Sequence, residues 1–288
     1  MNYTALMIDL MKSRSYKQRE RSRIQSHILM TISLLNQVFE ENIACPVEFS
    51  AGDEIQGLFL TPEAAYLYYR LFSMYLYPVK IRAGIGVGTW DIKVKDHSTT
   101  IQDGPVYHRA RSAIECADDA EGYSVLFLSN HSSDITINTV IGGAAAIIEN
   151  QTVYQNQLTL LVELMFPIYN STVQSFINKI DNRLQKSLHE KNEFDHFIGD
   201  INKALPMDYI DNQQIILDVP INAEDACKRF PPFISEGKKR GIPTKLSELL
   251  NISRQVIEKA LKAGNVYTAR NMAITAVNEM ARINREAF

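Results

Sequence analysis

Carboxylates at two places in the first sixty residues have the types and spacing of a cation site. Asp9 follows an apolar run and would end a strand, whereas Asp53 and Glu54 follow Gly52 in a short turn between two apolar runs. Glycine supplies the positive φ of such a turn, and acids at a strand tip are typical oxygen ligands. If the two strands are neighbours, Asp9 and Asp53 face each other and repel unless a divalent cation lies between them.

We therefore predict a metal site at Asp9 and Asp53, with Glu54 as a third ligand or an exposed turn residue. The alternative is that both aspartates have turn or cap roles, which are common for this residue type. Each one closes an apolar strand with no local helix to cap, and this favours the metal interpretation.

The elements that position these acids follow from hydrophobic periodicity, which distinguishes helices from strands. The predicted order is βαββαβ followed by αβ. This order builds an α+β fold with a ferredoxin-like or palm antiparallel sheet backed by helices, in which the first strand lies beside the hairpin. The expected ranges are helix 17–41, hairpin 47–60, helix 61–77, strand 79–88, helix 104–117 and strand 124–129.

Composition limits the class of protein. The 288 residues carry a net charge of -3, with a pI near 6.1, which excludes a chain that coats nucleic acid over its whole surface. Three cysteines without CxxC spacing predict neither a disulfide framework nor a zinc site. The N-terminus lacks a signal-peptide pattern, and the longest small-and-apolar run, residues 140–148, is too short for a membrane helix. We expect a soluble, cytoplasmic protein without a membrane partner.

A second motif lies near the C-terminus, where the pattern predicts a helix-turn-helix. Ser247 is a small residue where two helices would cross, Asn251 suits a left-handed turn and Ser253 would cap the second helix. Between residues 221 and 264 nine basic residues oppose five acids, a local charge of +4. Such a piece can reach a phosphate backbone, although helix pairs of this kind also serve protein contacts. The predicted DNA-binding residues are Lys245, Ser253, Arg254, Gln255 and Lys259.

The expected domain boundaries place a palm domain at 1–130, a helical connecting region at 131–220 and the helix-turn-helix domain at 221–288. Predicted helices at 135–149, 158–169 and 172–188 fill the middle region, followed by a polar stretch over 189–200 and short β-like pieces near 215–219.

The first half resembles the palm domains of class III nucleotide cyclases and GGDEF proteins, and the whole chain is similar to the SatD family. The similarity lies in Ala5-Leu6-Met7-Ile8-Asp9, in Ala51-Gly52-Asp53-Glu54-Ile55, in Ile81 to Gly88 and in Val106-Tyr107-His108-Arg109-Ala110-Arg111. Arg111 matches the cyclase arginine that stabilises phosphoryl transfer. Tyr107 stands where the cyclases carry an asparagine, and Phe49 stands where adenylyl cyclases carry a base-reading lysine.

This resemblance implies a nucleoside triphosphate as ligand or substrate. Asp9 and Asp53 would hold Mg²⁺ or Mn²⁺, while Arg111, with Tyr107 beside it, would act on the transferring group. The loop residues Lys12, Ser13 and Arg14, together with Gly52, would meet the phosphates. Arg14, Arg19 and Arg21 are clamp candidates whose alternative is a solvated helix face, and Arg111 has the same alternative.

Two hypotheses for function follow. The first is a DNA-binding regulator whose cyclase-like domain senses a nucleotide through Mg²⁺. The alternative is an active metal-dependent nucleotidyl cyclase or transferase that makes a nucleotide signal. A homodimer is expected in either case, because class III cyclases complete their site with two chains and operators are often palindromic.

Overall fold

A mixed five-stranded sheet organises the first half of the chain. The computed structural model describes residues 2–49, 54–91, 102–180, 182–198, 205, 217–229 and 232–286. The strand order is β2-β3-β1-β4-β5; the first four strands are antiparallel neighbours and β5 runs parallel to β4. The strands are β1 (Tyr3–Leu10), β2 (Ile43–Phe49), β3 (Ile55–Phe59), β4 (Ile81–Gly88) and β5 (Val125–Leu128), and a separate short pair joins β6 (Ile168–Tyr169) to β7 (Ile221–Asn222).

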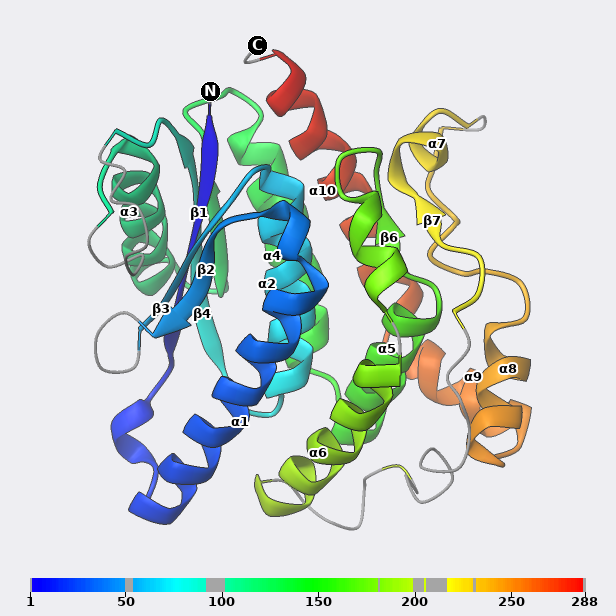
Figure 1. Ribbon diagram of the computed structural model, residues 1–288. Helices are drawn as coiled ribbons and strands as arrows, with labels where there is room; N and C mark the ends of the chain where they lie inside the picture. The colour runs from blue at the N-terminus through cyan, green and yellow to red at the C-terminus, as the bar shows by residue number, and fades with distance from the viewer. Residues whose placement is uncertain are drawn as a thin grey trace.

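Helices cover both faces of the sheet, with α3 on one face and α1, α2 and α4 on the other; α5, α6 and α10 lie beyond this second group (Figure 1). The helices of the sheet half are α1 (Gln18–Val38), α2 (Pro62–Leu76) and α3 (Pro105–Asp119). Those that follow are α4 (Asp134–Glu149), α5 (Val153–Met165), α6 (Asn182–Ile198), α7 (Ala223–Cys227), α8 (Ile242–Leu250), α9 (Arg254–Ala263) and α10 (Val266–Glu286).

The sheet and α3 are in unusually close contact because β4 presents glycines to the helix. A Cβ added to Gly86 would collide with the amide nitrogen of Ala110 and the carbonyl oxygen of Val106. Gly84 meets the next turn of the helix in the same way. The absence of side chains lets the two backbones touch, which fixes α3, and with it Arg111, relative to the sheet.

A buried ion triad ties the sheet half to the helical half. Glu163 on α5 lies 2.5 Å from Arg70 on α2 and 2.8 Å from Arg270 on α10. The three side chains are at most 5% exposed. Around the triad, one continuous apolar cluster runs from β1 to α10.

The order βαββαβ followed by αβ is confirmed, and the order of the four antiparallel strands is that of a split βαβ unit. The expectation of an antiparallel sheet is wrong for its last strand, because β5 pairs in parallel with β4. Thr61 caps α2 as predicted, accepting a hydrogen bond from the amide of Ala64 at 3.4 Å.

The second half departs further from the sequence prediction. The helix expected at 172–188 is a 3₁₀ segment, Gln174–Lys179, followed by α6, which extends through most of the polar stretch at 189–200 for which no helix was predicted. The long helix α10 was not predicted. The β-like pieces near 215–219 fall partly outside the described residues; 217–219 form no strand and β7 begins at Ile221. The domain boundaries at 130 and 220 stay predictions.

None of the helices within the described ranges has both the length and the apolar character needed to cross a membrane.

Candidate functional site

The end of β1 places Asp9 on the face of the sheet that α3 covers. Leu6, Ile8 and Leu10 join the core on the α1 side, while Ala5 and Met7 pack under α3. Because side chains alternate along a strand, Asp9 continues the α3-side row. Ile8 on β1 pairs with Ile55 on the antiparallel neighbour β3. The residues that follow this pair at the same end of the sheet are Asp9 on β1 and Glu54 just before β3.

Glu54 and Arg111 form a two-pronged ion pair at this end of the sheet. Nη2 of Arg111 donates to Oε1 of Glu54 at 2.7 Å, and Nη1 donates to Oε2. Both hydrogen bonds raise the pKa of Arg111, and the charges of Glu115 and Asp9 act in the same direction. Asp9 and the Glu54–Arg111 ion pair therefore lie at the same end of the sheet and are called here the carboxylate cluster.

Two acids of the carboxylate cluster, Asp9 and Glu54, lie within the described residues. No group of three or more potential ligands among histidine, cysteine, aspartate and glutamate occurs in the described part of the chain. Glu54 is already neutralised by Arg111, so it is a poor candidate for the third ligand. Asp53 and Gly52 lie outside the described residues, and the predicted meeting of Asp9 with Asp53 stays a prediction.

Tyr107 lies one turn before Arg111 on α3 and belongs to the apolar layer under that helix. Its side chain is 5% exposed, and its hydroxyl has no hydrogen-bond partner within the described structure. Burial raises the pKa of this phenol, so it stays protonated at neutral pH. The packing favours a core role, and the predicted catalytic role remains without support from the geometry.

The predicted phosphate-binding loop lies on the opposite face of the sheet. Ser13 and Arg14 line a cavity of about 280 Å³, called here the α1 pocket, at the start of α1. Lys12 precedes them in the left-handed conformation with φ 55°, and its side chain is exposed. The described residues that line it are Leu10, Ser13, Arg14, Tyr16, Arg21, Ile24, Gln25, Ile28 and Phe49.

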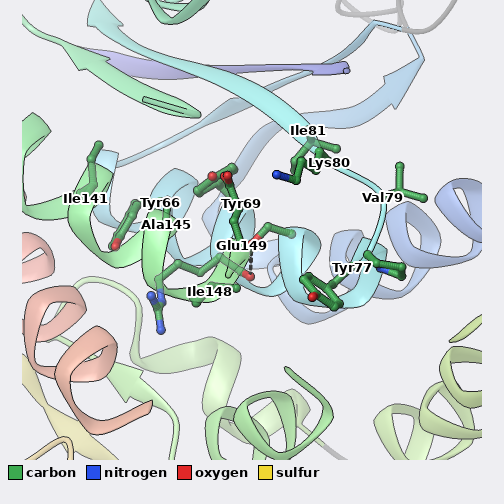
Figure 2. Close-up of a pocket in the computed structure, with 13 residues that line it drawn as sticks. Tyr66, Tyr69, Tyr77, Val79, Lys80, Ile81, Ile141, Ala145, Ile148 and Glu149 are labelled. Carbon is green, nitrogen blue, oxygen red and sulfur yellow. Dashed lines mark hydrogen bonds between the residues drawn. The ribbon is translucent and has the colours of Figure 1, made fainter. Parts of the chain in front are cut away.

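A different cavity lies between α2, α4 and the start of β4, where tyrosines gather (Figure 2). Tyr66, Tyr69 and Tyr77 line it, with Lys80 and Glu149 among the polar groups around it. Its volume of about 30 Å³ holds one or two water molecules. This space is too small for a nucleotide, so the tyrosines serve the core.

The predicted helix-turn-helix is present as α8 and α9. Asn251 has the left-handed conformation with φ 50° and ψ 39°, as expected for the turn. The hydroxyl of Ser247 donates to the carbonyl of Ile252 at 2.6 Å, which fixes the crossing of the two helices. Ser253 is the N-cap residue of α9, but its side chain makes no capping hydrogen bond.

The outer face of α9 carries most of the predicted DNA-binding residues. Arg254, Gln255 and Lys259 are exposed, whereas Ile257 and Leu261 are buried against the rest of the protein. Lys245 on α8 differs because its ammonium pairs with Asp218 and lies 5.7 Å from the centre of the Phe166 ring.

Comparison with known proteins identifies the family. The model of the SatD family matches residues 3–191, about two thirds of the chain. The chain belongs to the SatD family. No curated protein matches this SatD-family chain.

Solved structures similar to the SatD-family protein include two of a bacterial light-regulated adenylyl cyclase. Both have a TM-score of 0.32 and cover 44% of this chain, at 12% and 14% sequence identity. The match covers 42% of the first structure's chain and 74% of the second's. The chain therefore spans about two fifths of the length of the first.

Sequence reasoning missed the aromatic walls of the α1 pocket. Tyr16 and Phe49 are far apart in the chain and stand at the ends of a loop and a strand, where an aromatic residue has no periodic pattern. Arg21, considered as a clamp residue, does line this pocket, and Arg19 does not.

Proposed function

We propose that this SatD-family protein is a DNA-binding regulator whose N-terminal sheet end binds a nucleotide. The observation that carries the proposal is the exposed face of α9, which follows a fixed turn and presents Arg254, Gln255 and Lys259. The helix carries three basic side chains and one acid, because Lys262 adds to the arginine and lysine and Glu258 opposes them. A basic, exposed second helix can enter a major groove.

The nucleotide part of the proposal rests on Asp9 and Arg111 lying together at one sheet end. Its metal part, with Mg²⁺ or Mn²⁺, depends on Asp9 acting with Asp53. A homodimer with two copies of α9 would read two half-sites, and light scattering tests that state.

An active nucleotidyl cyclase or transferase is the second candidate, favoured by the neighbourhood of Arg111 and Asp9. Regulation ranks first because Glu54 occupies both terminal nitrogens of Arg111, so the guanidinium is engaged before any phosphate arrives. Incubation with each nucleoside triphosphate and Mg²⁺ or Mn²⁺ separates the two candidates: a cyclic product or pyrophosphate supports the enzyme, and neither supports the regulator.

DNA binding is tested by fluorescence anisotropy of a labelled fragment of the gene's own promoter, over a series of salt concentrations. We expect the association constant to fall with salt, and Arg254→Ala and Lys259→Ala each to weaken binding about tenfold. Arg19→Ala is the matched control, because it removes the same charge from an exposed helix outside the helix-turn-helix. Equal binding by all three variants, or binding independent of salt, would refute the DNA-binding proposal.

A further inference from the structure

The α1 pocket has a polar rim and an apolar floor. Its polar lining residues include Ser13 and two exposed arginines, Arg14 and Arg21. Its apolar lining residues include Leu10, Ile24 and Ile28, whose side chains are buried. A cavity of about 280 Å³ with this division suits a small ligand that is charged at one end and organic at the other.

The rim is held in place by local hydrogen bonds. The hydroxyl of Ser15 donates to the carbonyl of Lys12 at 2.7 Å, closing the turn after β1. Nη2 of Arg21 reaches the carbonyl of Ser13 at 3.5 Å, which brings α1 against that turn. Both arginines therefore belong to one structured edge, although their positions are seven residues apart.

The described charged residues that line the pocket are all positive. The described residues that line it include two arginines and no acid. Among the residues that the structure describes, no carboxylate pairs with Arg14 or Arg21; nearby Glu20 accepts a hydrogen bond from the amide of Lys17 at 2.9 Å. Two guanidinium groups that no described carboxylate neutralises favour a dianion, and their forked donors match phosphate oxygens.

The apolar lining residues indicate which kind of organic group the dianion would carry. Phe49 and Tyr16 are half-buried aromatic side chains beside the aliphatic ones. An aromatic or aliphatic body would remove these surfaces from water, whereas a free phosphate ion would leave them uncovered.

The pocket is also separate from the acids of the carboxylate cluster. Asp9 belongs to the α3-side row of β1, while Leu10 faces the α1 side and lines the pocket. None of the described residues that line the pocket is a carboxylate, so they offer a divalent cation no charged oxygen ligand. The positive charge that attracts an anion here would come from the two arginines.

We propose that the α1 pocket binds a small organic phosphate monoester without a divalent cation. This inference does not rest on DNA binding or on a nucleotide at the carboxylate cluster. Phenyl phosphate is a suitable probe because it combines a dianion with an aromatic body, and inorganic phosphate is its counterpart without the body.

The test is isothermal titration calorimetry of the full chain with phenyl phosphate in the presence of EDTA. We expect measurable binding that is tighter than that of inorganic phosphate. Arg14→Gln and Arg21→Gln should each weaken phenyl phosphate binding about tenfold or more. Arg19→Gln, which changes a residue on the same helix as Arg21 but outside the pocket lining, should leave binding unchanged. Phe49→Ala should weaken binding of phenyl phosphate more than binding of inorganic phosphate.

Three outcomes would overturn the proposal: no binding by the wild-type protein, binding that requires Mg²⁺, or equal loss in the Arg19→Gln control. Circular dichroism melting of each variant confirms that it is folded, and Arg14 and Arg21 are exposed, so their replacement leaves the core intact. Retained promoter binding alongside absent phenyl phosphate binding would refute this inference alone.

Discussion

Two pairs of arginines lie in contrasting surroundings in this protein. Arg70 and Arg270 are buried and share the carboxylate of Glu163 between the sheet half and the helical half. Arg14 and Arg21 are exposed at the rim of the α1 pocket, where the described residues supply no acid. A buried guanidinium must have an internal partner because removing its charge from water is costly, whereas an exposed one is solvated and stays available to a ligand. Pairing thus separates arginines that hold the fold from those available for binding.

The largest effect on stability is expected from a substitution in the buried ion triad. Glu163→Ala leaves two buried guanidiniums without their carboxylate, and we expect a loss of about 3–5 kcal/mol in the free energy of unfolding. Urea denaturation followed by circular dichroism measures it. Arg21→Ala is the control from the exposed side and should change stability by less than about 0.5 kcal/mol. Similar losses of unfolding free energy in the two variants would show that the buried and exposed arginines do not differ in their contribution to stability.

A second prediction sharpens the contrast along α1, which carries exposed Arg21 and buried His27. The ring of His27 stacks on Phe194 with centroids 3.9 Å apart, and its Nε2 lies 2.9 Å from the carbonyl oxygen of Tyr75. Burial lowers the pKa of His27 from 6.5 to about 4, so the unfolded chain binds the extra proton first. The stability contributed by neutral His27 is present above pH 6.5 and is lost as the pH falls toward 4.

The difference of about 2.5 pKa units corresponds to roughly 3 kcal/mol over that interval. We expect the unfolding free energy of the wild type to fall between pH 7 and pH 4 more steeply than that of His27→Gln. Denaturation curves at four pH values provide the comparison. Parallel pH dependences for the two proteins would show that His27 does not control this part of the profile.

Strands and caps of the first half were predictable because each has a local cause. Thr61 followed by a proline indicates a helix start, and Asn251 indicates a left-handed turn; both are present. The part of α6 beyond residue 188 was missed because Lys191 and Asp195 are charged residues buried as a pair, so the apolar period of that helix is interrupted. Periodicity cannot reveal a core position occupied by an ion pair.

The candidate site was predictable only in part. Asp9 and Arg111 were chosen from the sequence, and in the structure the charge of Asp9 raises the pKa of Arg111. That Glu54 would pair with Arg111 depends on contacts between residues 57 positions apart, which no local pattern reports. Local patterns also do not report that Asp9 and the α1 pocket lie on opposite faces of the sheet. Side chains alternate along a strand, so Asp9 and the next residue, Leu10, which lines the pocket, face opposite sides.

The most direct test of the account is whether a nucleotide changes DNA binding through the carboxylate cluster. Anisotropy titrations of the promoter fragment, with and without each nucleoside triphosphate and Mg²⁺, compare the wild type with Asp9→Asn. We predict that one triphosphate shifts the wild-type DNA dissociation constant at least about fivefold, and that Asp9→Asn abolishes the shift while still binding DNA. A wild-type constant that no nucleotide alters, or a shift that persists in Asp9→Asn, would contradict it.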